Sequence, residues 1–240
     1  MIAADQPTIF PATLIAAVSS RDDGNMKFGI EPANQVRARR HRFLRSVGIA
    51  PEHTTLVSVT YDTDDFAKYR IATHHDKTTG MNTPEVIEHA DALAVGQPNH
   101  ALFLPLADCV GAILYDPVRQ GLMVSHLGRH SVEVSGGARS VEYLQKVFQS
   151  DLRDVLVWLS PAVGSATYPL YEFGGRGLHE VIIQQLTATG IPTGNIEASR
   201  IDTARNEQYF SHSEFLKGNR DDPGRFAIVA MMTAQGEPAA

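Results

Sequence analysis

The sequence has very little cysteine: among 240 residues there is a single one, Cys109. A lone cysteine cannot form an internal disulfide, so the chain fits a reducing compartment and keeps a thiol free for chemistry. Long apolar runs are also missing, because none approaches the roughly 20 residues that a transmembrane helix needs. Residues 1–11 lack the basic stretch and long apolar run of a secretory leader. We therefore expect a cytoplasmic protein with no membrane partner.

Positive charge is in deficit as well. The chain carries 21 basic and 27 acidic residues and a formal net charge of −6, which gives no long-range attraction to nucleic acid. The composition is otherwise that of a globular protein, with 43% hydrophobic and 20% charged residues. No segment rich in proline, glycine and serine separates two halves, so residues 1–240 are predicted to form a single domain.

Strand-like and helix-like segments alternate along the chain, which favours an α/β or α+β fold. Apolar residues at helical spacing predict helices at residues 34–47, 140–148 and 179–189. Short apolar runs predict strands at residues 13–19, 56–61, 90–95, 101–106, 110–115, 121–125, 155–159 and 226–232. The four runs between residues 90 and 125 imply a central sheet. The polar stretch before them, up to about residue 88, is predicted to be an excursion.

The sharpest local feature is a thiol and an imidazole that each follow an apolar strand. Cys109 and His126 come just after two of the predicted strands, and side chains at strand ends can converge. Such a pair suits a nucleophilic thiol with a histidine base, or a zinc site with an open position for water. A buried cysteine and a hydrogen-bonded histidine explain the same residues structurally. Asp108, next to Cys109, is predicted either to orient an imidazole or to cap the following backbone.

Short motifs around these residues resemble the YfiH-like polyphenol oxidoreductase laccase family. Leu106-Ala107-Asp108-Cys109 is similar to its T-A-D-C-P motif, and the segment SHLGRHS, which contains His126, is similar to its H-A-G-W-R-G motif. Further matches follow in the family's order: Ser19-Ser20-Arg21, Ala90-Asp91-Ala92-Leu93, Ser160-Pro161-Ala162-Val163-Gly164, Tyr209-Phe210-Ser211-His212 and Gly224-Arg225. Because the motifs are spread between residues 15 and 232, the resemblance covers most of the chain.

The resemblance implies a layered α-β-β-α fold with a mixed central sheet, which is also similar to the deamidase domain of cytotoxic necrotizing factor toxins. It implies a metal, usually zinc, held by His, Cys and His, with Cys109 and His126 matching the second and third ligands. It also implies action on purine nucleosides by phosphorolysis, adenosine deamination or related cleavage. The candidates for binding phosphate through a guanidinium group are Arg21, Arg40, Arg129 and Arg225.

The chain departs from the family pattern at the first metal ligand. Thr60 stands where the family has histidine, and threonine is a poor zinc ligand. We therefore predict that, if zinc binds, the third ligand is one of three other histidines: His74, His75 or His130. Copper oxidation is disfavoured, because one cysteine without paired H-x-H motifs cannot build the copper sites of true laccases.

The leading hypothesis from the sequence is a metal-assisted enzyme that uses a purine nucleoside and phosphate, with Cys109, His126 and Asp108 at its centre. Two alternatives stay open. A metal-free hydrolase built on Cys109 and His126 is supported by the toxin-like fold. A degraded family member that keeps the pocket only to bind nucleosides is supported by Thr60.

Overall fold

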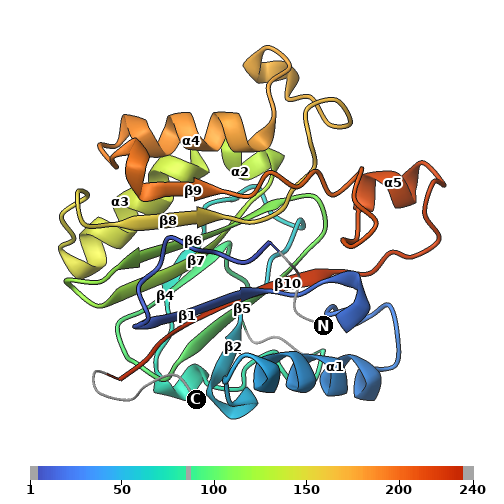
Figure 1. Ribbon diagram of the computed structural model, residues 1–240, viewed down its shortest axis with the longest axis horizontal. Coiled ribbons are helices and arrows are strands. Elements are labelled where there is room, and N and C mark those ends of the chain that lie inside the picture. Colours follow the sequence, from blue (N-terminus) through green and yellow to red (C-terminus); the bar gives the residue numbers. More distant parts are fainter. Residues whose placement is uncertain (1–4, 85–87, 235–240) are drawn as a thin grey trace.

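The protein consists of four layers in the order helix, sheet, sheet and helix (Figure 1). The coordinates are those of a computed structural model and describe residues 5–84 and 88–234. The two mixed sheets confirm the predicted layered α-β-β-α fold within the α+β class. Within the described ranges, no helix has the length and apolar character needed to cross a membrane.

A four-stranded sheet forms one of the two inner layers. Its strands are, in spatial order, β1 (Leu14–Val18), β10 (Phe226–Met232), β5 (Ala101–Leu106) and β2 (Thr54–Leu56). Strand β2 pairs with β5 in parallel, and the other neighbours are antiparallel. Helix α1 (Ala33–Ser46) covers the outer face of this sheet (Figure 1). Its buried residues are Val36, Arg40, Phe43 and Leu44, which share one face of the helix.

A six-stranded sheet forms the second inner layer. In spatial order its strands are β3 (Tyr69–Ile71), β4 (Ala92–Val95), β7 (Gly121–Leu127), β6 (Val110–Asp116), β8 (Leu156–Leu159) and β9 (Ile196–Ala198). Three helices lie on its outer face (Figure 1): α2 (Arg129–Glu133), α3 (Gly136–Phe148) and α4 (Leu178–Ala188). Helix α5 (His212–Leu216) lies to one side. The 3-10 turns are Arg21–Asp23, Pro51–His53, His74–Asp76, Tyr171–Phe173 and Thr193–Asn195.

The central strands are apolar on both faces because each sheet is covered on both sides. In β6, Ile113 and Tyr115 pack in the core between the sheets, whereas Val110, Ala112 and Leu114 pack in the core beneath the helices. Successive side chains of a strand point to opposite faces, so the strand serves both cores. The continuous apolar runs of the sequence are therefore a consequence of burial between layers.

The predicted strand at residues 56–61 is wrong in its position. The strand is β2, at Thr54–Leu56, and the Val57 amide still donates a hydrogen bond to the Phe103 carbonyl. Beyond Val57 the chain leaves the sheet and contributes to the wall of a cavity. Because β2 is an edge strand, it has no second neighbouring strand to keep the following residues extended.

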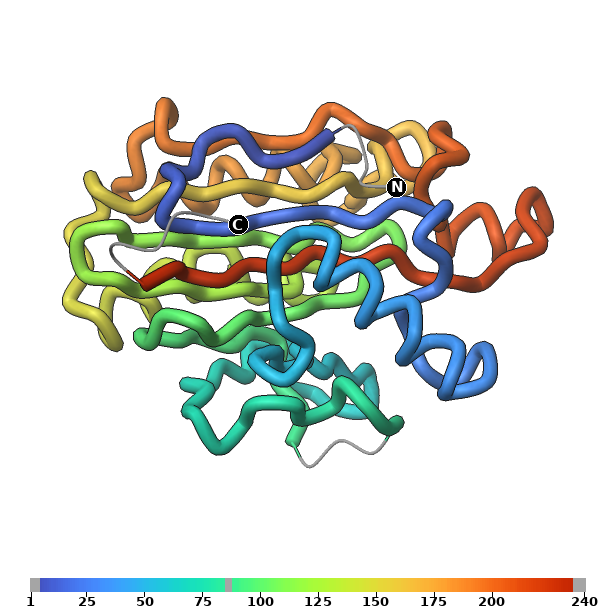
Figure 2. The backbone as a smooth tube through the Cα atoms, turned by 60° about the horizontal axis from the view of Figure 1, so that its bottom comes forward, coloured from blue at the N-terminus to red at the C-terminus, as the bar shows by residue number. Residues whose placement is uncertain are grey.

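The four apolar runs between residues 90 and 125 do not form one central sheet. Strand β5 belongs to the four-stranded sheet, whereas β4, β6 and β7 belong to the six-stranded one. The chain therefore crosses from one sheet to the other and back within these runs. The polar excursion before them contains β3 and the His74–Asp76 turn, and it forms a projecting lobe at the bottom of Figure 2.

Candidate active site

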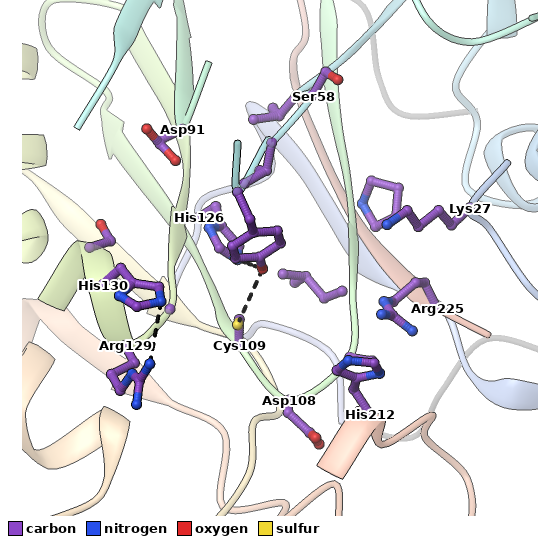
Figure 3. Close-up of a pocket in the computed structure, with 18 of the residues that line it drawn as sticks. Lys27, Ser58, Asp91, Asp108, Cys109, His126, Arg129, His130, His212 and Arg225 are labelled. Carbon is purple, nitrogen blue, oxygen red and sulfur yellow. Dashed lines mark hydrogen bonds between the residues drawn. The ribbon is translucent and has the colours of Figure 1, made fainter. Parts of the chain in front are cut away.

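A cavity of about 560 Å³ opens beside the ends of β5, β6 and β7. Cys109 and His126 lie at its centre (Figure 3). On one side of them are Asp91, Arg129 and His130, and on the other are Lys27, Arg225 and His212. The volume lies in the range of small-molecule sites. The cavity is therefore the candidate active site.

Strand pairing brings Cys109 and His126 together. Gly111 in β6 is paired with His126 in β7, and Cys109 directly precedes β6. The Tyr61 hydroxyl lies 3.4 Å from His126 Nε2 and 4.0 Å from Cys109 Sγ. A methyl group on Gly128 would lie 2.9 Å from Cys109 Sγ and 3.2 Å from His126 Cε1. The thiol, imidazole and phenol thus surround one small space, which a side chain at position 128 would obstruct.

The three central side chains are uncharged at neutral pH. Burial raises the pKa of the Cys109 thiol to about 11, and burial lowers the pKa of His126 to about 4. The neighbouring Cys109 raises the pKa of Tyr61, whose side chain is otherwise largely exposed. The site therefore presents a thiol, a neutral imidazole and a phenol, which all exchange hydrogen bonds without carrying charge.

Asp108 is held by distant parts of the chain and is turned away from the imidazole. Its Oδ1 accepts a hydrogen bond of 2.7 Å from the Thr203 hydroxyl, and its Oδ2 accepts one of 2.6 Å from the Ser213 amide. Nδ1 of His126 is buried and has no hydrogen-bond partner among the described residues. The Asp108 carboxylate thus neither orients the imidazole nor caps the backbone that follows it, but accepts hydrogen bonds from two distant segments. Its catalytic role stays a prediction.

Three basic side chains gather on one side of Cys109: Lys27, Arg225 and His212 (Figure 3). Neither Lys27 nor Arg225 forms an ion pair with another described residue. Burial lowers the pKa of all three groups. Arg225 is half-buried and Lys27 is exposed at the mouth of the cavity. Two cations without an ion-pair partner beside an imidazole are suited to bind an anion such as phosphate. We call these three residues the cationic group.

Asn25 holds the two cations of this group next to each other. Its Oδ1 accepts a hydrogen bond of 2.9 Å from the Lys27 amide and one of 3.0 Å from the Arg225 amide. Asn25 itself is 1% exposed. The loop after β1 and the start of β10 are therefore fastened together through one buried amide group.

The other arginines predicted to bind phosphate are committed elsewhere. Arg21 lies over the Phe210 ring and is not among the residues that line the cavity. Arg40 reaches the cavity wall, but it is 1% exposed and donates to the carbonyls of Met26 and Gly80. Burial lowers its pKa to about 9. Arg40 thus fastens α1 to two neighbouring loops.

Arg129 and the predicted third metal ligands are not brought to Cys109 and His126. Arg129 lines the cavity, but its side chain is half exposed and lies 3.7 Å from Glu133. His74 and His75 stack on each other in the projecting lobe and do not line the cavity. His130 does line the cavity, where it stacks on Phe66 and lies 3.5 Å from Glu133.

Sequence reasoning missed four residues of the site: Lys27, Tyr61, Asp91 and His212. Asp91 lies in one of the motifs and Tyr61 directly follows Thr60, so both positions could have been noticed. Asp91 is 4% exposed, and its backbone carbonyl accepts a hydrogen bond of 2.8 Å from the His126 amide. His212 ends the motif Tyr209-Phe210-Ser211-His212 and could also have been noticed, whereas Lys27 carries no pattern that distinguishes it from surface residues.

Comparison with known proteins supports the resemblance drawn from the motifs. The family described as multi-copper polyphenol oxidoreductase laccase matches residues 18–174, which is more than half of the chain. The chain belongs to this family. The family assignment agrees with the motifs around Cys109 and His126.

Individual relatives of the family are distant in sequence. The chain is 22% identical over 214 residues to a purine nucleoside phosphorylase of Bacteroides thetaiotaomicron, a match that covers 79% of this chain and 76% of that protein. The crystal structure of YlmD from Geobacillus stearothermophilus covers 98% of both chains at 18% identity, with a TM-score of 0.84. YfiH from Bacillus licheniformis covers 92% of this chain and 93% of its own at 21% identity, with a TM-score of 0.81. The two structures share the fold of this chain.

The metal implied by the family does not fit the side chains found here. The family description names copper, and the resemblance implies zinc held by His, Cys and His. Within residues 5–84 and 88–234, no three His, Cys, Asp or Glu side chains are grouped closely enough to hold a metal ion. Beside Cys109 and His126, a third polar group is the hydroxyl of Tyr61. We therefore assign no chemical step to a metal.

Proposed function

We propose that this protein is a purine nucleoside phosphorylase. The observation that carries the proposal is the cationic group of Lys27, Arg225 and His212 in the same cavity as Cys109 and His126. A cavity of about 560 Å³ has room for a small ligand and an anion. The distant similarity to a purine nucleoside phosphorylase supports the same class of reaction.

In the proposed reaction, phosphate lies against the cationic group and the ribose lies between phosphate and base. An oxygen of hydrogen phosphate attacks C1′ of the ribose, and the bond between C1′ and the base nitrogen breaks. The electron pair of that bond leaves with the base, which gains one proton while the phosphate loses one. The two cations hold the phosphate in place and neutralise part of its negative charge. Positioning and electrostatic stabilisation of this kind are the main ways in which an enzyme accelerates such a displacement.

The uncharged central group favours this reaction over the Cys/His hydrolase alternative. A nucleophilic cysteine needs a low pKa and a histidine base that a third group orients. Here burial shifts the pKa of Cys109 upward and that of His126 downward, and Nδ1 of His126 has no partner among the described residues. Neutral hydrogen-bonding groups are instead suited to the hydroxyl groups of a ribose.

The test is the release of base from inosine and from adenosine, with and without phosphate. We expect release to require phosphate and to yield one ribose 1-phosphate per base. In Cys109→Ala and in His126→Ala the rate should fall by about tenfold, because each variant loses a hydrogen bond to the ribose. His53→Ala is the matched control, since His53 does not line the cavity, and it should keep the rate of the unmodified protein.

Other outcomes of this experiment would replace the proposal. Turnover that is equally fast without phosphate would indicate hydrolysis or adenosine deamination. Binding of a nucleoside that raises the melting temperature, without any turnover, would indicate the degraded binding protein. Zinc stays a prediction of the resemblance, and the metal content of protein purified without added metal tests it. About one zinc per chain would show that a ligand other than the described groups completes the site.

A further inference from the structure

One carboxylate oxygen of the cavity wall has no hydrogen-bond partner in the described part of the chain, although its residue is almost fully buried. Oδ2 of Asp91 accepts a hydrogen bond of 3.0 Å from the Lys68 amide. Oδ1 has no hydrogen-bond or ion-pair partner among the described residues, although the residue as a whole is 4% exposed. Oδ1 is not one of the fully buried polar atoms that lack a partner, so it is accessible from outside the protein. Oδ1 therefore faces the cavity that Asp91 lines.

The position of Asp91 relative to the cationic group is informative. Lys27, Arg225 and His212 lie on one side of Cys109 and His126, and Asp91 lies on the other (Figure 3). Arg129 and His130 lie on the same side as Asp91, but both side chains lie within 4 Å of Glu133. An anion is attracted to the cationic group and is repelled from Asp91 itself. The part of a ligand that reaches Asp91 must instead donate hydrogen, because an ionised carboxylate only accepts hydrogen bonds.

We propose that Asp91 determines substrate specificity by accepting a hydrogen bond from an N–H group of the purine base. This inference rests on the proposed phosphorylase function. With phosphate on the cationic group and the ribose at the centre, the base extends toward Asp91. Inosine offers the N–H of its ring and adenosine offers its amino group. Purine riboside, which has hydrogen at the same position, offers neither.

The site discriminates by the cost of an unsatisfied buried group. When the base has no N–H, Oδ1 of Asp91 loses water on binding and gains no hydrogen bond in return. Sites of this kind reject analogues that lack the donor much more strongly than apolar pockets reject analogues of a different size. Asp91 is therefore expected to separate bases by hydrogen-bonding pattern.

The test variant is Asp91→Asn, which keeps the shape of the side chain and an oxygen to accept from the Lys68 amide. The amide NH2 that replaces Oδ1 is a donor and opposes the N–H of the base. We expect kcat/KM for inosine and adenosine to fall about 10- to 100-fold. For purine riboside it should stay within about twofold of the unmodified value. The purine riboside rate also shows that the variant is folded, since it uses the same cavity.

Asp65→Asn is the matched control. Asp65 is an exposed carboxylate near Asp91 that also accepts a hydrogen bond from a backbone amide, at Ala67, but it does not line the cavity. This variant should leave all three substrates unchanged. An equal fall for all three substrates in Asp91→Asn, or no fall, would overturn the inference while the phosphorylase function stands. Failure of the unmodified protein to cleave any of the three would overturn the proposed function and the inference with it.

Discussion

The two sides of the cavity are built in different ways. The central thiol and imidazole belong to the ends of two paired strands, and burial shifts the pKa of each further toward the uncharged form. The cationic group comes from the loop after β1, from α5 and from the start of β10, and a single buried amide at Asn25 joins two of these segments. The sheet thus supplies neutral groups at fixed positions, and the loops supply charge. We therefore expect changes to the cations to affect mainly the KM for phosphate. Changes to the neutral groups should affect mainly the kinetics with the nucleoside.

The largest effect is expected from removing a cation. Arg225→Ala should raise the KM for phosphate about 10- to 100-fold, because it removes charge-assisted hydrogen bonds to the anion. The KM for the nucleoside should change much less. Arg225→Lys keeps the charge, so its KM for phosphate should lie between those of the unmodified protein and Arg225→Ala. The control Arg37→Ala, at an exposed position of α1, should change neither the KM for phosphate nor the KM for the nucleoside. Steady-state kinetics with each substrate varied in turn measure this. Equal increases in both KM values would mean that Arg225 supports the whole cavity.

A smaller effect is expected from crowding the neutral side. Gly128→Ala would place its methyl group 2.9 Å from Cys109 Sγ, and overpacking of this kind costs about 1 kcal/mol or more. We expect kcat/KM for the nucleoside to fall about tenfold, with the KM for phosphate nearly unchanged. The φ of Gly128 is −91°, so an alanine is not strained there. Gly194→Ala, which meets no atom within 4 Å, is the control, and a comparable loss in it would argue against the steric explanation.

The smallest effect is a difference in pH dependence. Burial, followed by the charge of Arg225, lowers the pKa of Lys27 below its ordinary 10.5. Lys27 therefore loses its proton at a lower pH than an unperturbed lysine, and phosphate binding should weaken by a few-fold as the pH rises toward about 10. His126, with a pKa of about 4, and Cys109, with a pKa of about 11, do not change protonation there. The KM for the nucleoside should consequently stay flat.

Lys27→Arg provides the decisive comparison for this pH dependence. Arginine stays protonated throughout the range, so the KM for phosphate should no longer rise with pH. Lys146→Arg, at an exposed position of α3, should keep the original profile. If the rise persists in Lys27→Arg, then another group is responsible for it.

Much of the fold was accessible from the sequence because its signals are local. The apolar runs of β6 and β7 predicted strands on their own, and the motifs placed Cys109 and His126 at strand ends. Cys109 directly precedes β6, and His126 is the second-last residue of β7. The position of β2 was not accessible, because residues 56–61 have the composition of a strand and leave the sheet only because β2 lies at its edge. The β-propensity of a segment does not show whether the strand lies at the edge or in the middle of a sheet.

The sequence by itself determined the α+β class, the family, and the pairing of one thiol with one imidazole at strand ends. Only the tertiary structure decided which charged residues join them. It turned Asp108 toward Thr203 and Ser213, buried Arg40 among backbone carbonyls, and placed Lys27 beside Arg225. These partners lie far apart in the chain and follow no period, so their contacts arise from how the layers and loops pack and leave no trace in local spacing.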